Sequence, residues 1–421
     1  MTPGPLVGAA HGVITPSRPG PLAGYAARGP VLATSTIDDL EATVLVLDRV
    51  GLRLAWVTID CVAVPTALAK RLASVVRDEL GAGTRVLVAA SHTHSGPAHW
   101  LGRFAPGHEA PLDRLAVDEL LEHVRVIAAE AFHRRQPSDL SWAEPIVRGL
   151  AAPRAVASEA IPIRVGVLAI HAGGVLRAVL VDAPCHPTVL GAESTGWSAD
   201  WPGGLRRALR AAHPGVEVAF LNGACGDLST RFTRRDSSAA EADRLGGLVA
   251  EAIIESVPNA RPLVGALTLH DGRVPLATRR VDAEEASARL NAARKALGAG
   301  TDPIDRSLVD GALIELAVAR SVVDETIEVP VSIAHIDGIC WVATPLEVFS
   351  STAASLGAGR TVRLLGCVDG YLGYLPDAAA VKADTYEART ALFAPEAEPA
   401  FRIALERLLT LIHPSLTLET P

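Results

Sequence analysis

Several residue types and patterns are scarce in this 421-residue chain, and their scarcity excludes classes of protein. The five cysteines, Cys61, Cys185, Cys225, Cys340 and Cys367, are odd in number, widely spaced and form no Cys-x-x-Cys pair. A disulfide framework and a thiolate zinc site are therefore not expected. Lysine is rare beside arginine, while alanine, glycine and proline are abundant, a composition typical of GC-rich bacterial genomes.

Positive charge and long apolar runs are also lacking. The net charge is −8, so no basic face for a nucleic-acid partner is expected. The N-terminus has neither a basic segment nor an apolar stretch, which argues against a signal peptide. The best membrane-spanning candidate, 44–64, contains Asp48, Arg49, Arg53 and Asp60, and these charges exclude a normal transmembrane segment. We therefore expect a cytoplasmic protein.

Apolar residues, in contrast, make up 49% of the chain, enough for a large core. Short β-branched runs predict strands at 42–47, 54–59, 85–90, 175–181, 216–221, 339–343 and 361–365. Helical patterns lie between them, at 67–80, 112–132, 204–212, 239–255, 282–297 and 306–319. This alternation predicts an α/β fold of mixed α+β layers, with a sheet covered by helices. We predict one catalytic unit over 1–421, with a possible helical insertion at 276–325 and a wrapping arm at 1–30.

Five of the predicted strands end in glycine- or proline-containing turns that carry chemically useful side chains. These turns include His92 and His94, then His186, then Asp227 and Ser229, then Glu347, and finally Asp369 and Tyr371. In open α/β sheets, sites form at the carboxyl ends of strands, where rigid strands hold the ligands. We therefore expect a site at these strand ends.

His92 and His94 are two residues apart, so in an extended segment both would point toward one side. A hydrogen-bonded core histidine and a first-turn glutamate at Glu347 remain the simpler alternatives. Two histidines, a carboxylate and a further hard oxygen donor would suit Zn²⁺ with one position left for water.

Four other residues have alternative interpretations. Ser229 is either a nucleophile, a substrate-binding hydroxyl or a turn residue, although no Gly-x-Ser-x-Gly surrounds it. Arg154 is either a ligand for a substrate oxygen or a surface residue. Asp60 and Asp200 could orient a histidine, and Asp200 could instead cap the helix that follows it.

At this point the motifs resemble those of the neutral/alkaline non-lysosomal ceramidases. The most specific is Ser91-His-Thr-His-Ser-Gly-Pro97. The others follow in order: Gly12–Pro16 at the start, then Asp182–Thr188, Ser198–Gly203, Asn222–Ser229, Pro345–Glu347 and Asp369–Tyr374. The resemblance covers about residues 8–390, the catalytic domain of that family.

The resemblance implies a zinc ion bound by His92, His186, Glu347 and Tyr371. It also implies roles around the substrate amide for further side chains: His94, Arg154, Ser229, Tyr374 and Tyr386.

The sequence departs from the family pattern near these positions. Thr230-Arg231 stands where Pro-Asn usually follows the serine, Asp369 replaces an asparagine, and Pro153 replaces another. No immunoglobulin-like domain follows the last motif before Pro421. The metal chemistry is therefore expected to apply to this chain, whereas ceramide itself is not predicted as the substrate.

The sequence thus predicts a zinc-dependent amidohydrolase that uses metal-activated water on a small linear N-acyl amide. One alternative is a Ser229-dependent acyltransferase or esterase on the same scaffold. Another is a non-catalytic ligand-binding homologue. Other metallohydrolases also contain His-x-His, but here Ser95-Gly96 follows instead of Asp-His, and no eightfold βα repeat is visible. The oligomeric state, acyl chain and amine are not predicted.

Overall fold

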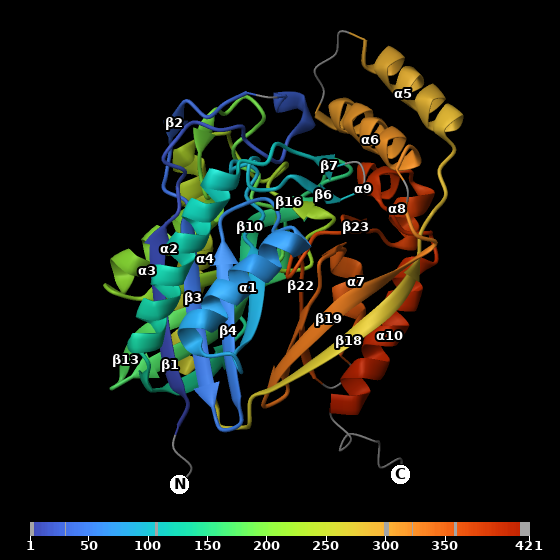
Figure 1. Cartoon of the computed structure of the whole chain (residues 1–421). Helices are drawn as coiled ribbons and strands as arrows, with labels where there is room; N and C mark the ends of the chain where they lie inside the picture. Colours follow the sequence, from blue (N-terminus) through green and yellow to red (C-terminus); the bar gives the residue numbers. More distant parts are fainter. Residues whose placement is uncertain are drawn as a thin grey trace.

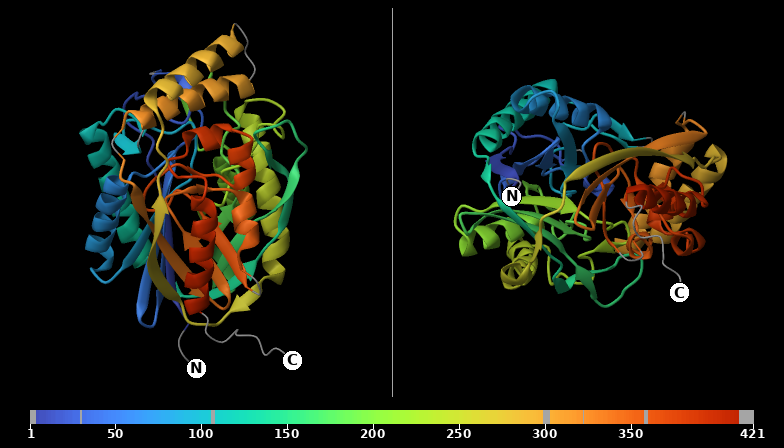
Figure 2. Two further views of the ribbon diagram at one scale, coloured as in Figure 1. Left: turned by 90° about the vertical axis from the view of Figure 1, so that its right-hand side faces the viewer. Right: turned by 90° about the horizontal axis from the view of Figure 1, so that it is seen from below.

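The computed structural model describes residues 4–29, 31–105, 108–298, 303–321, 323–357 and 360–412. Three sheets of four or five strands meet around a central core, and helices cover their outer faces. Viewed from below, the blue, green and orange-to-red parts of the chain lie side by side (Figure 2, right). The predicted α/β layers are confirmed, and one face of each sheet is covered by the other sheets instead of by helices.

The first sheet has the strand order β5-β4-β3-β1-β8. Its strands are β1 (Leu6–Val13), β3 (Glu41–Arg49), β4 (Leu52–Ile59), β5 (Arg85–Ala90) and β8 (Gln136–Pro137). Helices α1 (Thr66–Leu80) and α2 (Arg114–His133) pack on its outer face (Figure 1). The predicted wrapping arm is wrong for Leu6–Val13, because this segment pairs along its whole length with β3 inside the sheet.

The second sheet has the order β15-β13-β12-β9-β17. Its strands are β9 (Asp139–Ala143), β12 (Gly166–Ala172), β13 (Val175–Ala183), β15 (Glu217–Asn222) and β17 (Arg261–Leu263). Helices α3 (Trp201–Ala212) and α4 (Ala239–Ser256) cover it. Beside it lie β10 (Ile146–Pro153), β11 (Ile161–Arg164) and β16 (Leu228–Ser229), which form a small sheet of their own.

The third sheet has the order β18-β19-β20-β22. It comprises β18 (Thr268–Ala277), β19 (Thr326–Ile336), β20 (Ile339–Ala343) and β22 (Thr361–Leu365), packed with α10 (Ala397–Ile412). Between β18 and β19 the chain forms two helices, α5 (Ala283–Leu297) and α6 (Pro303–Ala319), which pack on each other at the top of Figure 1. These helices lie within the predicted segment 276–325, whose first two residues belong to β18 and whose last residue directly precedes β19.

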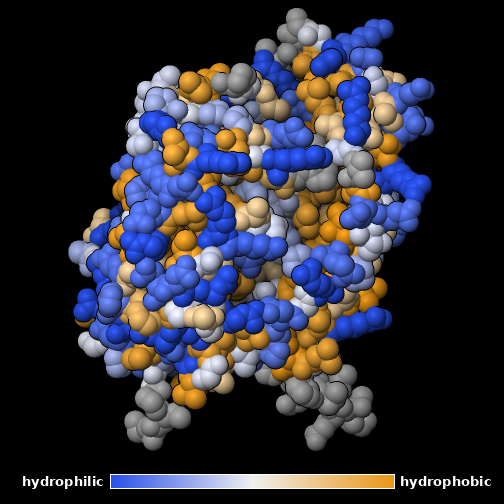
Figure 3. All heavy atoms as spheres, viewed as in Figure 1, coloured by the Kyte–Doolittle hydropathy of each residue, from blue (hydrophilic) through white to orange (hydrophobic). Residues whose placement is uncertain are grey.

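The remaining elements are short. They are β2 (Ser35–Thr36), β6 (Arg103–Ala105), β7 (His108–Glu109), β14 (Gly196–Trp197), β21 (Glu347–Val348), β23 (Tyr374–Leu375), α7 (Ser350–Ser355), α8 (Ala378–Lys382), α9 (Tyr386–Thr390), η1 (Ala26–Arg28) and η2 (Val257–Asn259). None of the described helices has the length and apolar character that crossing a membrane requires. On the face shown in Figure 3, hydrophilic residues lie among hydrophobic ones.

Each large sheet contains one parallel strand pair, and this pattern places the strand ends that the sequence singled out. The pairs are β4 with β5, β13 with β15, and β20 with β22. A helix connects the two strands of each pair, namely α1, α3 and α7 respectively. Because the carboxyl ends of parallel strands lie at the same sheet edge, the five predicted turns emerge toward one another.

Candidate metal centre

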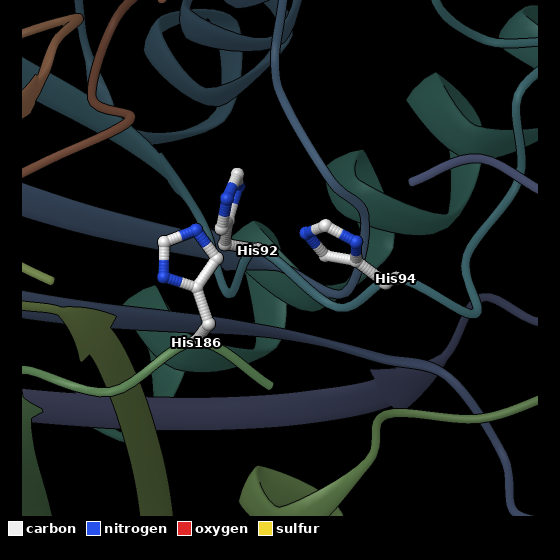
Figure 4. Close-up of side chains that lie close together, drawn as sticks. All are labelled: His92, His94 and His186. Atoms are coloured by element: carbon white, nitrogen blue, oxygen red, sulfur yellow. The ribbon is translucent and has the colours of Figure 1, made fainter. Parts of the chain in front are cut away.

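Three histidines from two of these turns face one another (Figure 4). His92 and His94 follow β5, and His186 follows β13. One ring nitrogen from each of the three lies within 4.8 Å of the others, and His92 and His186 are buried while His94 is half-buried. The structure therefore brings the three predicted histidines into a single cluster.

The backbone conformation at His92 differs from the extended segment assumed from the sequence. His92 has a φ of 69°, in the left-handed region that non-glycine residues rarely adopt. Even so, the His92 and His94 ring centroids are only 5.1 Å apart. Such a conformation costs about 1 kcal/mol or more, which the surrounding contacts must offset.

Backbone carbonyls orient two of the histidine rings. Nδ1 of His92 lies 2.5 Å from the Val62 carbonyl oxygen, and Nδ1 of His186 lies 2.8 Å from that of Cys225. A ring nitrogen that donates to a carbonyl leaves the other nitrogen with a free lone pair. Nε2 of both rings is therefore the atom available to a metal.

Asp60 and Asp200 do not orient a histidine. The Asp60 carboxylate binds the Arg206 guanidinium and accepts from the Glu41 backbone N–H. Asp200 caps α3 by accepting from the Trp201 N–H. The orienting role lies with main-chain atoms, whose positions no side-chain pattern in a sequence reveals.

Glu347 joins the two rings at their Nε2 atoms. Its Oε2 lies 3.2 Å from Nε2 of His92 and 2.9 Å from Nε2 of His186. Its other oxygen accepts a hydrogen bond of 2.5 Å from the Tyr371 hydroxyl. Glu347 begins the short strand β21, and the next helix, α7, begins only at Ser350, so the structure contradicts the alternative of a first-turn glutamate. All four predicted ligands thus lie in direct contact, with His94 beside them.

Burial and neighbouring charges set the protonation states of this cluster. Burial and the Arg154 charge lower the pKa of His186 to about 4. Burial, reinforced by His92, lowers the pKa of His94 well below its usual value. Burial raises the pKa of Glu347, but His92 and His186 outweigh it and hold that pKa well below its usual range. Burial lowers the pKa of His92, but the neighbouring Cys367 and Glu347 outweigh it and raise that pKa well above its usual value. His94 and His186 are therefore neutral and Glu347 is ionised, the forms in which these groups bind metals, whereas His92 must release a proton to bind one.

Arg154 connects the histidines to two tyrosines. Its Nη1 lies 2.9 Å from Nε2 of His186, and its Nη2 donates to the Tyr374 hydroxyl at 2.9 Å. Its Nε donates at 2.6 Å to Glu387, which is buried on α9. The Tyr386 ring lies 5.9 Å from that of Tyr374. The sequence reasoning missed Glu387, whose only signal is its position directly after Tyr386.

Ser229 lies close to the cluster through its backbone. It forms a β-bridge with His186, and its hydroxyl accepts from the Arg231 backbone N–H at 3.2 Å. Within the described part of the chain, the hydrogen bonds place no histidine or carboxylate on this hydroxyl. Ser229 therefore lacks the adjacent base that a serine nucleophile needs.

The donor set fits a divalent zinc ion. His94 supplies the clearest sign, because among the described residues neither of its buried ring nitrogens has a hydrogen-bond partner. Buried polar atoms are nearly always paired, so unpaired ones call for an explanation such as an ion or a water. Imidazole and carboxylate ligands are those that zinc prefers at catalytic sites. His92, His186 and Glu347 would hold the ion, with Tyr371 or His94 next to it.

The same architecture occurs in solved structures. The crystal structure of a neutral ceramidase from Pseudomonas aeruginosa matches the whole chain and 76% of its own length, with a TM-score of 0.78 and 17% sequence identity. A ceramidase complexed with C2 matches with a TM-score of 0.76 and 17% identity, over the whole chain and 77% of its own. No family model and no curated protein matches the sequence. The resemblance noted in the motifs is thus confirmed at the level of the fold.

Proposed function

We propose that this protein is a zinc-dependent hydrolase that cleaves the amide bond of a small N-acyl compound. The observation that carries the proposal is the convergence of His92, His94 and His186 on one point, with Glu347 bridging two of them. The neutral-ceramidase fold supports an amide as the bond that is cleaved. A zinc ion bound there would supply Lewis-acid activation of water and of the carbonyl.

The chain's own residues surround the place where charge develops on the carbonyl oxygen. Tyr374 accepts a hydrogen bond from Arg154, and its hydroxyl lies 3.5 Å from Nε2 of His186, so a substrate oxygen would compete with this long contact for the hydroxyl proton. Burial raises the pKa of Tyr374 well above its usual value, which keeps this proton in place. A preorganised donor of this kind is commonly worth about 3 kcal/mol in the transition state.

His94 is the group that transfers protons in this proposal. Burial lowers the pKa of this half-buried ring well below its usual value, so the ring is neutral. Neither ring nitrogen has a hydrogen-bond partner among the described residues, and the Tyr25 ring packs against the His94 ring at an angle, with the centroids 5.0 Å apart. A neutral imidazole can take a proton from the attacking water and return it to the leaving amine. For the rival acyl-transfer mechanism, no described histidine or carboxylate is hydrogen-bonded to the Ser229 hydroxyl.

The test compares zinc content and amidase activity in wild type and His92→Ala. Zinc is measured by elemental analysis after dialysis, and activity is measured on N-acyl amines of several chain lengths. We expect the variant to lose both, while His270→Ala, an exposed histidine on β18, retains both. Full activity in zinc-free His92→Ala would contradict the proposal, and inhibition by serine-directed reagents but not by chelators would favour Ser229.

A further inference from the structure

Two arginines that follow Ser229 lie beside the metal centre. Nη1 of Arg231 donates at 2.9 Å to the backbone carbonyl of Arg154, whose side chain contacts His186. Arg234 donates to the carbonyl of Thr188, two residues after His186. Both side chains are half-buried, and the two residues lie three positions apart in the segment that follows Ser229. Their guanidinium groups therefore contact the backbone beside the cluster, and Arg231 also interacts electrostatically with Arg154 and Glu387.

No carboxylate that the structure describes forms an ion pair with either arginine. Glu387 is the nearby carboxylate, and it is engaged with Arg154 at 2.6 Å. Among the side chains that the structure describes, the hydrogen-bond partners of Arg231 and Arg234 are the carbonyl oxygens of Arg154 and Thr188 and the Ser307 hydroxyl. Arg244, on the helix that follows, shows the usual pattern, because it pairs with Glu241.

A purely structural role explains these arginines only in part. Carbonyl oxygens satisfy some of their N–H groups, but they leave the charges without a counter-ion. Burial and the nearby Arg154 charge both lower the pKa of Arg231, as expected where positive charge accumulates. Guanidinium groups with free N–H donors bind carboxylates and phosphates in a planar, two-pronged geometry.

We propose that the substrate carries an anionic group, a carboxylate or a phosphate, near its scissile amide, and that Arg231 and Arg234 bind this group. The inference rests on the proposed amidase function and specifies its substrate class.

The test uses three substrates with one acyl chain: N-dodecanoylglycine, N-dodecanoylethanolamine and the phosphate ester of the latter. A hydrogen bond to a charged group contributes about 1.5–3 kcal/mol, so wild type should prefer an anionic substrate at least about tenfold in kcat/KM. The better of the two anionic substrates identifies the group as carboxylate or phosphate. Equal kcat/KM for all three would overturn the inference.

The variants Arg231→Gln and Arg234→Gln should each lower this preference about tenfold, and Arg231→Lys should restore part of it. Arg235→Gln is the matched control, because this exposed neighbour lies near Glu241 and should leave the preference unchanged. A preference that survives in both Gln variants would also overturn the inference.

Binding separates this inference from the proposed function. Calorimetry on protein without added zinc should show tighter binding of N-dodecanoylglycine than of N-dodecanoylethanolamine, with the difference reduced in Arg231→Gln and by salt. If no substrate is hydrolysed but this difference is seen, the amidase proposal fails and the anion site stands. Equal binding of the two compounds to wild type would refute the anion site, whatever the activity.

Discussion

At the scale of single residues, Glu347 holds the centre together, because its two oxygens contact both histidine Nε2 atoms and the Tyr371 hydroxyl. The two rings are fixed by backbone carbonyls, so they should keep their positions without it. The motifs around His92, His186 and Glu347 predicted this cluster. They could not predict Glu387 or the carbonyl partners, because these depend on how distant segments pack.

Replacing Glu347 with glutamine should weaken zinc binding and leave the fold intact. The amide keeps the shape and an acceptor for Tyr371 but removes the negative charge that a divalent cation needs. Even groups that only orient metal ligands contribute about 10–100-fold in affinity, so at least about a tenfold loss is expected. A competition titration with a chromophoric chelator measures it, with circular dichroism as the check on folding. Unchanged affinity would exclude Glu347 from the ligand set.

Asp369 provides a second prediction at this scale. Burial raises its pKa to about 6, although its Oδ1 accepts from the Val88 N–H. The pKa of an aspartate in the unfolded chain is about 3.9. Between pH 3.9 and 6, Asp369 is therefore protonated in the folded state and ionised in the unfolded state. Its stabilising contribution is therefore present below about pH 4 and is lost as the pH rises through 6.

Asp369→Asn should therefore be more stable than wild type at pH 8, by about 1–2 kcal/mol, and nearly equal to it near pH 3, below the unfolded pKa. The amide stays neutral at both pH values while its oxygen still accepts from Val88. Urea unfolding of the metal-free proteins at the two pH values measures the difference, with the exposed Asp118→Asn as control. A gain of the same size at both pH values would show that the carboxylate charge is not its cause.

At the scale of elements, the predicted strands at 85–90, 339–343 and 361–365 are confirmed with their ends, and the helix predicted at 67–80 begins one residue earlier. Their apolar periodicity is strong because one face packs on helices and the other on a neighbouring sheet. Strand β1 was not predicted, since its Gly8 and Gly12 weaken the pattern. Gly8 is needed there, because a Cβ would lie 2.1 Å from the Ala131 carbonyl oxygen of α2.

The segment after β1 is predicted to set the position of His94. Gly24 has a φ of 99°, and a Cβ there would lie 2.6 Å from His94 Cα. Gly24→Ala should therefore lower kcat at least about tenfold, since an error of about 1 Å in placement can cost about 100-fold. Gly51→Ala is the control: its φ of 85° carries the same backbone strain, but its Cβ would meet open space. If both variants reduce kcat equally, strain and not the contact with His94 is responsible.

At the scale of the whole molecule, three sheets must keep a fixed arrangement for the turns to meet. The apolar core between the sheets supplies most of the contact. A buried arginine, Arg206, adds a polar connection between the first and second sheets. Arg206 on α3, which covers the second sheet, pairs with Asp60 at the end of β4 and with Glu41 on β3, both in the first sheet. Removing one partner of such a buried set leaves a charge uncompensated, which lowers the free energy of unfolding by about 3–5 kcal/mol.

The pH dependence of this connection gives the last prediction, carried by Glu41. Burial raises the pKa of Glu41, but Arg206 and Arg210 outweigh it and hold the pKa at about 2, below the unfolded value of about 4.3. For a lowered pKa, the stability is present above pH 4.3 and is lost as the pH falls toward 2. The free energy of unfolding of wild type should therefore exceed that of Glu41→Gln by about 2–3 kcal/mol at pH 6, and the difference should fall below about 1 kcal/mol as the pH approaches 2. Urea unfolding across this range measures the gap, and Asp118→Asn, from an exposed pair with Arg71, should show almost none. A gap that is constant with pH would assign the loss to packing, and the electrostatic connection between the two sheets would then be refuted.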